Sequence, residues 1–555
     1  MRSDADPPAS PRCRHPQAGR WFDPRQRETH AATETGLMHS RVCALATEGH
    51  GRRGRALAAH RFANRVFARC AAALACSAVM AALSQPVGWG AAVQARIDSY
   101  VERERQASGI PGIALAIVHA DQTVHLRGFG HDGRGKPVSA DTPFPIGSLS
   151  KSFTALLVRQ AIESGRLSAD APVQRYLPWF RVADAQASAR ITPRHLLNQT
   201  SGLSRADGMA PLLQGSMASA EELARGLSTV SLAHPVGERF EYSNLNFVVL
   251  GALLQAVTGQ SWQESIDGRV LLQLAMSHSF TDRDAARQAG MTAVHRMWFG
   301  VPIAQPLVLP PGYAAAGGLV SSASDLARYL QMLLAGGVAP GGRVLSEEGV
   351  MQLLAPASPP GHSTLLSADF AFRYGEGWFV GPFGVANGAR WHLGNLASFA
   401  AWMVLLPETR QAVVVLINAN SELPINEVNA VISRVPIGVV NLLHGRPPPQ
   451  GPSLRRAYLP FDAASLLAIA LLAALTWRAA RARHPGWSVA TMLIAVALVA
   501  AVHAAGLTLA TFADFAPDLA LVVDLALVLS CLPALWRAAA WMQRFARDGR
   551  DARRA

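Results

Sequence analysis

Apolar positions follow different periods along the chain. Residues 112–130 contain two β-rich runs joined at a polar turn, which predicts a β-hairpin. A second group of such runs fills residues 371–418, with a turn at Glu408-Thr409-Arg410. Helical spacing dominates between them, most clearly in Ser148–Ser164, Asn246–Thr258 and Asp325–Leu334. We therefore expect an α+β fold, in which an antiparallel sheet closed by both halves of the domain is flanked by helices and carries an all-helical insertion.

The C-terminal region has a different pattern. It holds three long apolar stretches: Ala463–Trp477, Trp487–Thr511 and Leu519–Trp536. Each approaches or exceeds the roughly 17 to 25 residues that cross a bilayer, the first only with its flanks. They predict three transmembrane helices within residues 459–541. The alternative is a set of core helices in a soluble all-α domain.

Charges around these stretches favour the membrane interpretation. The first connection between these stretches carries Arg478, Arg481 and Arg483. The charged residues of the second are Asp514 and Asp518, with no basic residue, and the tail, residues 542–555, is again rich in arginine. Positive charge collects on the cytoplasmic side of a membrane. The first connection and the tail are therefore expected in the cytoplasm, and the body of the chain on the periplasmic side of the inner membrane.

The N-terminal region predicts the same export. Residues 1–69 form a basic extension, which suggests a start codon assigned too early, although a cytoplasmic extension remains the alternative. An apolar run then begins at Cys70 and ends near Ser84, in the order of a secretory signal, which we place at residues 70–92. The remaining parts are an exported domain over residues 96–440 and a Pro-rich linker over residues 441–458.

Composition and charge agree with this division. Hydrophobic residues make up 50% of the chain and charged residues 16%. The net charge of +13 is concentrated at the ends, because residues 70–450 carry 27 basic and 26 acidic side chains, a balance of +1. Membrane topology explains basic ends, so we expect no nucleic-acid partner. The exported domain contains no cysteine, which excludes a disulfide, a thiolate metal site and a cysteine nucleophile there.

Lysine use points to the chemistry. Only two of the 51 basic residues are lysines, Lys136 and Lys151. A lysine in such an arginine-rich chain suggests a task that arginine cannot perform, and loss of a proton is such a task. Ser148 lies three residues before Lys151 at the start of a predicted helix, so the two side chains share one face. This arrangement is typical of an activated nucleophile. Lys136 lies in a polar turn and is expected to be a solvated loop residue.

Three short motifs carry a family resemblance. They are Ser148-Leu-Ser-Lys151, Tyr242-Ser-Asn244 and His392-Leu-Gly394. In this order the chain resembles the serine β-lactamase and penicillin-binding-protein superfamily over about residues 96–440, in particular its branch of class C β-lactamases, D-Ala-D-Ala carboxypeptidases and D-aminopeptidases.

The resemblance implies a role for each motif. Ser148 would attack the acyl carbon, and Lys151 with Tyr242 would exchange the proton. Asn244 would hold Lys151 and the substrate amide. The backbone N–H groups of Ser148 and Asn395 would form the oxyanion hole, and no metal or cofactor would be needed.

The third motif departs from the family pattern. His392 and Gly394 stand where the superfamily has Lys-Thr-Gly, and Asn395 and Ser398 replace glycines found in relatives. The carboxylate-binding lysine is therefore missing, which favours amide or ester substrates that lack this anchor.

The sequence thus predicts a membrane-anchored periplasmic serine hydrolase that works through an acyl-enzyme on a small molecule or peptide. Its layout resembles periplasmic prodrug-activating peptidases, which favours a substrate that contains a D-amino acid. An esterase and a β-lactamase or D-Ala-D-Ala carboxypeptidase remain alternatives, as does a non-catalytic penicillin-binding-like sensor. The sequence leaves the oligomeric state open.

Overall fold

The structure is a computed structural model. It describes residues 90–120, 122–363, 370–421, 426–481, 486–504 and 517–551. The expected N-terminal extension and nearly all of the expected signal sequence lie outside these residues.

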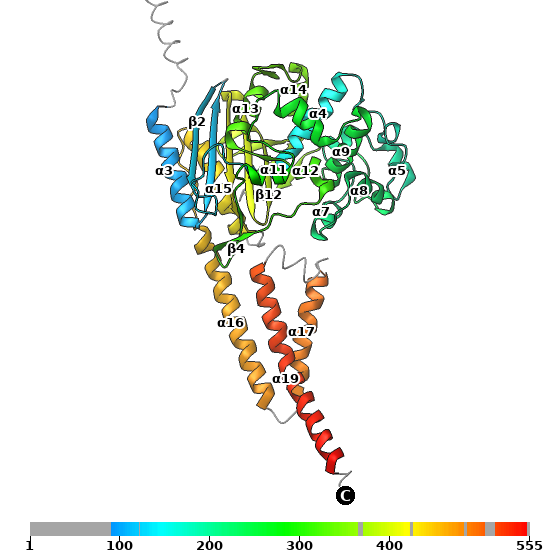
Figure 1. Ribbon diagram of the computed structural model, residues 1–555, viewed down its shortest axis with the longest axis vertical. Helices are drawn as coiled ribbons and strands as arrows, with labels where there is room; N and C mark the ends of the chain where they lie inside the picture. Colours follow the sequence, from blue (N-terminus) through cyan, green and yellow to red (C-terminus); the bar gives the residue numbers. More distant parts are fainter. Residues whose placement is uncertain are drawn as a thin grey trace, which may run out of the picture. The chain divides into compact units, whose positions relative to one another are not determined.

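An eight-stranded sheet with the order β2-β1-β14-β13-β12-β11-β10-β9 organises the domain that precedes the C-terminal helices (Figure 1). Every neighbouring pair in it is antiparallel. The strands are β1 Gly112–His119, β2 Gln122–Gly130, β9 Gly361–Ser363, β10 Phe370–Tyr374, β11 Phe379–Phe383, β12 Ala386–Leu396, β13 Phe399–Leu406 and β14 Gln411–Ile417. The predicted N-terminal hairpin is confirmed as β1 and β2. Because β1 pairs with β14, both ends of the domain close the sheet as expected.

The sheet is buried on both faces, and strand β14 shows this most clearly. All seven of its residues are buried. Ala412, Val414 and Leu416 belong to one apolar core, while Val413, Val415 and Ile417 belong to the other, as the two-residue period of a strand requires. Helices α3 (Ala91–Ser108) and α15 (Asn426–Leu443) contact the sheet on one side, and α13 (Ala323–Leu334) contacts β1 and β14.

The helical part lies between β2 and β9 in sequence. Besides α13 its helices are α4 Ser150–Glu163, α5 Ala185–Arg190, α6 Pro193–Leu197, α7 Arg205–Leu213, α8 Ala220–Gly226, α9 Asn244–Thr258, α10 Trp262–Ile266, α11 Arg283–Gln288, α12 Ala314–Gly317 and α14 Glu347–Leu354. Short strands interrupt it: β3 Phe144–Pro145 with β6 Val320–Ser321, β4 Val294–Trp298 with β5 Val301–Gln305, and β7 Val338–Ala339 with β8 Gly342–Arg343. Strand β15, Ala419–Asn420, joins β4.

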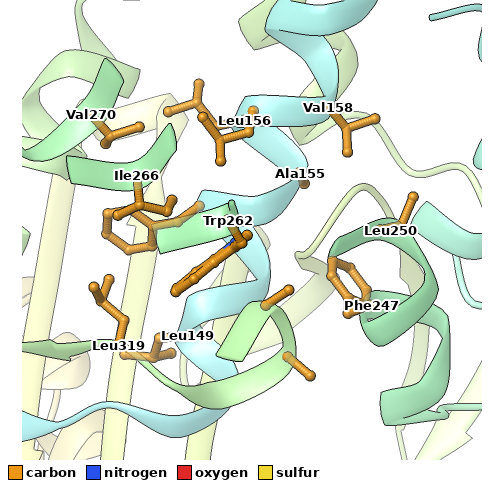
Figure 2. Packing of buried hydrophobic residues seen from close by; sticks show 14 of the residues in the cluster. Leu149, Ala155, Leu156, Val158, Phe247, Leu250, Trp262, Ile266, Val270 and Leu319 are labelled. Atoms are coloured by element: carbon orange, nitrogen blue, oxygen red, sulfur yellow. The ribbon is translucent and has the colours of Figure 1, made fainter. Parts of the chain in front are cut away.

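Helix α4 runs through the apolar core of this region. Figure 2 shows Leu156 and Val158 of α4 among side chains of α9 and α10, including Phe247 and Trp262. The indole Nε1 of Trp262 donates to Thr154 Oγ1 at 2.8 Å. The first turn of α4, which carries the predicted base and directly follows the predicted nucleophile, is therefore held rigidly from several sides.

Three helices follow the catalytic domain: α16 Leu454–Arg481, α17 Gly486–Ala504 and α19 Pro517–Asp551. Two helical stretches of the described chain are long and apolar enough to cross a membrane, Leu454–Arg481 and Asp518–Arg547. The apolar part of α17 is shorter, Val489–Ala501. The expectation of three spans is thus supported for the first and third stretches, and the middle one stays a prediction.

Candidate active site

The predicted nucleophile and base, Ser148 and Lys151, lie where the chain enters α4. A short 3₁₀ turn, η2 (Gly147–Leu149), leads directly into α4. Gly147 has a φ of +50°, a conformation that glycine adopts without a steric penalty. This bend places Ser148 just before the helix and Lys151 within its first turn, so the predicted pair meets on one face.

Lys151 is fully buried and has three hydrogen-bond partners. Its Nζ lies 3.0 Å from Ser148 Oγ, 2.8 Å from Asn244 Oδ1 and 2.7 Å from the carbonyl oxygen of Ala316. All three partners are neutral, so none of them balances a positive charge on the amine. An unbalanced buried charge is costly, and the environment therefore favours the neutral amine.

Geometry and pKa agree on this protonation state. Burial lowers the pKa of Lys151 well below its usual range, and the charge of Arg205 lowers the pKa further. A neutral amine has two N–H groups and one lone pair. With the N–H groups donated to Asn244 and Ala316, the lone pair is directed at the Ser148 hydroxyl. This is the arrangement of a general base facing its nucleophile.

Tyr242 completes the polar cluster from the segment that precedes α9. Its ring centroid lies 5.1 Å from Lys151 Nζ. Burial raises the pKa of Tyr242 to about 12, although a hydrogen bond with Ser148 opposes the shift. The phenol therefore stays protonated at neutral pH. Of the two groups expected to exchange the proton, Lys151 has the properties of the base and Tyr242 those of a proton donor.

Asn244 is held from its other end by α7. Its Nδ2 donates to the carbonyl oxygen of Gly208 at 3.2 Å and contacts Met209 Sδ at 3.5 Å. A Cβ on Gly208 would lie 2.7 Å from the backbone nitrogen of Asn244, so this close approach requires glycine. The amide is thus oriented for Lys151, whereas the expected contact of Asn244 with a substrate amide would compete with α7.

The predicted oxyanion residues meet at the end of β12. This strand pairs with β11 only as far as Trp391, and beyond that point its edge faces η2. A Cβ on Gly394 would lie 2.8 Å from the backbone nitrogen of Ser148 and 1.9 Å from the carbonyl oxygen of Ile146. A Cβ added to Gly147 would lie 3.3 Å from the backbone nitrogen of Asn395. Glycine at 394 therefore brings the two expected N–H donors into one place.

His392 differs from the other predicted residues, because it is buried among aromatic rings behind the cluster. Its Nδ1 donates to the carbonyl oxygen of Leu393 at 2.6 Å, so Nε2 accepts from the Tyr374 hydroxyl at 2.9 Å. Burial, with the nearby Lys151, lowers the pKa of His392 to about 3. The ring is therefore neutral at physiological pH and, in this arrangement, offers a substrate neither a charge nor an unused ring nitrogen.

Gln199 is a positioning residue that the sequence analysis did not single out. It is fully buried with a φ of +61°, which is uncommon for a residue other than glycine. Its Oε1 accepts from the backbone nitrogen of Ser243 at 3.0 Å, between Tyr242 and Asn244. Its Oε1 also accepts from Asn246 Nδ2 in the first turn of α9. Gln199 thus fixes the chain between Tyr242 and α9, and no sequence signal marks this role.

Arg205 is a second residue that the sequence analysis missed. It begins α7, is exposed, and its backbone nitrogen donates to Glu241 Oε1 at 2.9 Å. Its charge reaches both Lys151 and Tyr242, since it lowers the pKa of each. The positive charge of Arg205, at the start of α7, therefore contributes to the electrostatics of the site.

A buried ion pair supports α4 from behind. Arg159 of α4 and Glu376 form a bidentate salt bridge with both side chains largely buried. Gly377 next to this pair has a φ of +76°, and a Cβ there would lie 2.9 Å from the carbonyl oxygen of Lys151. The turn Tyr374-Gly-Glu-Gly-Trp378 thus packs directly against the backbone of the base. Removal of one partner of such a pair typically costs about 3–5 kcal/mol.

Comparison with known proteins agrees with this geometry. The Beta-lactamase family profile matches residues 97–433, more than half of the chain. Protein flp of Staphylococcus aureus strain COL is 26% identical over 336 residues, which cover 59% of this chain and 64% of that protein. Penicillin-binding protein 4 of Amycolatopsis lactamdurans is 33% identical over 245 residues, 43% of this chain and 63% of that protein. The chain thus spans slightly less than two thirds of these curated relatives.

Solved structures give the same answer for the fold. An octameric penicillin-binding protein homologue from Pyrococcus abyssi aligns with a TM-score of 0.54 at 25% identity, over 64% of this chain and 78% of that one. A class C beta-lactamase aligns with a TM-score of 0.53 at 20% identity, over 64% of this chain and 97% of that one. The matched region contains every residue of the site. The chain belongs to the beta-lactamase family.

Proposed function

We propose that this protein is a membrane-anchored serine hydrolase that cleaves amides or esters through an acyl-enzyme on Ser148. The observation that carries the proposal is the neutral environment of Lys151, whose hydrogen bonds direct its lone pair at Ser148 Oγ. A purely structural lysine at this place would be expected to pair with a carboxylate. The same cluster argues against the non-catalytic sensor, because every group needed for acyl transfer is present.

Acylation starts with proton transfer from Ser148 Oγ to Lys151 Nζ. The oxygen then attacks the acyl carbon, and the N–H groups of Ser148 and Asn395 stabilise the negative charge on the former carbonyl oxygen. Tyr242 donates its proton to the leaving nitrogen or oxygen and recovers one from Lys151. The carbon–nitrogen or carbon–oxygen bond breaks, and the acyl group stays on Ser148.

Deacylation uses the same groups with water as the nucleophile. Water gives a proton to Lys151 and attacks the ester carbon of the acyl-enzyme. Ser148 leaves with a proton that returns through the cluster. Each of these steps is assigned to a side chain or backbone group of the cluster or to water.

The substrate class follows from the charges around the site. Neutral His392 occupies the position of the family's lysine and offers no anchor for a carboxylate from β12. Arg205 supplies a cation from the helical side instead. We therefore favour a peptide or natural-product precursor that carries its anionic group on the Arg205 side. The resemblance of the chain's layout to prodrug-activating peptidases favours a D-amino acid in it. An esterase with a neutral substrate is the alternative.

Labelling of membranes that contain the full chain tests the activity. A fluorescent fluorophosphonate should label the wild-type protein, and a fluorescent penicillin should label it more weakly, because β12 lacks the carboxylate anchor. Ser148→Ala should remove both signals and all turnover while the thermal unfolding temperature stays unchanged. Labelling of the alanine variant, or hydrolysis above a few per cent of wild type, would contradict the assignment.

The proposed location has its own test. The helices Leu454–Arg481 and Asp518–Arg547 support membrane association. The arginines at the end of α16 and in the C-terminal tail favour a catalytic domain on the periplasmic side of the inner membrane. A reporter active only in the periplasm should be active when fused after Gln450 and silent when fused after Ala555. Activity at position 555 would contradict both an odd number of C-terminal spans and this orientation.

A further inference from the structure

A long uncharged segment lies outside the catalytic cluster. From Met297 to Ser324 the sequence contains no Asp, Glu, Lys, Arg or His. Its first part is the turn and second strand of the β4–β5 hairpin, followed by a loop that leads to α12. The later part enters the core beside Lys151, which explains why it lacks charges. The hairpin and the loop need another explanation, because they are largely exposed.

Large apolar side chains of this segment face outward. Val301 is 52% exposed, Ile303 43% and Val308 66%. We call Val301 and Ile303 of β5, with the turn residue Phe299, the hairpin patch; Val308 lies in the loop that follows. Single exposed apolar residues are common on protein surfaces, but several together in an uncharged segment mark an interaction surface.

The hairpin patch lies directly beside the start of α16. Phe299 stacks on Phe461 with ring centroids 5.9 Å apart. Met297 of β4 shares a small buried cluster with Leu454, Ala457 and Tyr458. Phe461 comes two residues before the apolar stretch that we expect to enter the bilayer. The tip of the hairpin is therefore at the depth where the chain passes from the exported domain into the membrane.

The start of the other long apolar helix and a basic side chain lie at the same level. Leu519, near the N-terminal end of α19, packs against the buried cluster that Met297 forms with Leu454 and Tyr458. A Cβ on Gly300 would lie 3.5 Å from the Cα of Arg455, whose side chain is exposed. Aromatic rings beside arginine are typical of the headgroup layer, where rings lie at the boundary and guanidinium groups meet phosphates.

From these contacts we propose that the β4–β5 hairpin is a second membrane contact, which inserts the hairpin patch into the boundary between lipid headgroups and acyl chains. The inference rests on the proposed function in one respect, namely that α16 spans the bilayer. The occupant of the patch is lipid rather than a second copy of the chain, because the patch adjoins the starts of both long apolar helices.

Such a contact would also orient the catalytic centre. The backbone nitrogen of His295 in β4 donates to the carbonyl oxygen of Ser398 at 3.0 Å, in the turn after β12. Asn420 of β15, which pairs with β4, donates from Nδ2 to the carbonyl oxygen of Leu396 at 2.7 Å, next to Asn395. The base of the hairpin is thus bonded to the chain that carries an expected oxyanion donor. A hairpin seated in lipid would fix the height of the site above the bilayer.

Site-directed fluorescence in liposomes tests the proposal. The full chain, with its five cysteines replaced by serine, receives one cysteine at Val301 or at Ile303 and an environment-sensitive fluorophore. It is reconstituted in phosphatidylethanolamine and phosphatidylglycerol. Two matched exposed positions serve as controls: Leu467, 62% exposed on α16, and Met351, 58% exposed on α14 of the catalytic domain. Fluorophosphonate labelling of Ser148 confirms that each variant is folded.

The expected result is strong quenching of the labels at 301 and 303 by lipids that carry a nitroxide, and weak quenching by aqueous iodide, as at 467. The label at 351 should show the opposite. A label at 301 that behaves like the one at 351, while 467 is quenched by lipid, would overturn the hairpin contact alone. Failure of lipid quenching at 467 would overturn the anchoring by α16, and the hairpin contact with it. Self-quenching at 301 without lipid quenching would identify a second copy as the occupant and also overturn the proposal.

Discussion

The two sides of the candidate active site differ in how their polar groups are used. On the α4 and α9 side, Lys151 contacts Ser148, Asn244 and the Ala316 carbonyl, and these groups point toward one another. On the β12 side, His392 makes its hydrogen bonds with Leu393 and Tyr374 and lies behind the cluster. The polar groups of the first side are arranged for proton transfer, whereas both ring nitrogens of His392 are used in hydrogen bonds within the protein.

The difference separates chemistry from recognition. Proton transfer requires the base within hydrogen-bond reach of the nucleophile, so the α4 and α9 side has little freedom to change. Recognition by β12 needs a group that faces the substrate, and the His392 ring does not offer one in this arrangement. Under the proposed function, charge recognition falls to Arg205. The following predictions test this division, from the largest expected effect to the smallest.

Lys151→Arg should remove nearly all activity, by about 10³-fold in kcat/KM, because a guanidinium cannot accept the Ser148 proton. The matched control is Lys136→Arg, which changes the chain's other lysine on an exposed loop and should leave the rate unchanged. Steady-state hydrolysis of a soluble activated ester measures both. Activity within about tenfold of wild type would show that Lys151 supplies charge only.

Gly394→Ala should lower kcat by about 10²-fold, because the added Cβ would collide with the carbonyl oxygen of Ile146 and displace the two oxyanion donors. Gly226→Ala is the control, since a Cβ at Gly226 meets no atom within 4 Å. Single-turnover acylation rates, with thermal unfolding of both variants, separate a catalytic effect from loss of the fold. Wild-type acylation by Gly394→Ala would exclude the expected oxyanion hole.

Arg205→Gln should raise KM about tenfold for a substrate with a carboxylate near the scissile bond, since a charge-assisted hydrogen bond contributes about 1.5–3 kcal/mol. A neutral ester should be hydrolysed at a nearly unchanged rate. Arg225→Gln, on the exposed face of α8, is the control. Equal losses on both substrates would remove Arg205 from substrate recognition.

His392→Gln should have its clearest effect on the pH dependence of stability. The folded protein holds the pKa of His392 near 3, below its usual 6.5, so between these values the unfolded chain binds more protons. Wild-type stability should therefore fall as pH decreases from about 6.5 toward 3. The unfolding free energy of the variant should depend less steeply on pH, and the difference in slope should correspond to at most about one proton. Unfolding temperatures measured across this pH range check this. Identical slopes would mean that His392 is charged in the folded protein or not buried.

Much of the fold and of the α4 and α9 side could be predicted from sequence. The hairpin β1–β2 and helix α9 follow local periodicity, and the spacing of Ser148 and Lys151 places both on one helical face whatever surrounds them. The scarcity of lysine singles out Lys151, and the structure places its Nζ 3.0 Å from Ser148 Oγ.

Other features depend on contacts that sequence does not show. The orientation of His392 follows from Tyr374, which reaches it from the neighbouring part of the sheet. Gln199 acts through a buried amide and an unusual backbone conformation. Arg205 borders the site only because Gly208 lets α7 approach Asn244. Each is a tertiary contact between segments distant in sequence, to which neither periodicity nor composition is sensitive.

Mass spectrometry of the acyl-enzyme tests the central claim most directly. The protein is mixed with an activated ester and the reaction is stopped rapidly. The account predicts one acyl group on the peptide that contains Ser148 in the wild type, and none in Ser148→Ala or Lys151→Arg. The neighbouring hydroxyls of Ser150 and Ser152 are buried and donate to the carbonyl oxygens of Gly147 and Leu149. An adduct on either of these serines, or an undiminished adduct in Lys151→Arg, would contradict the account.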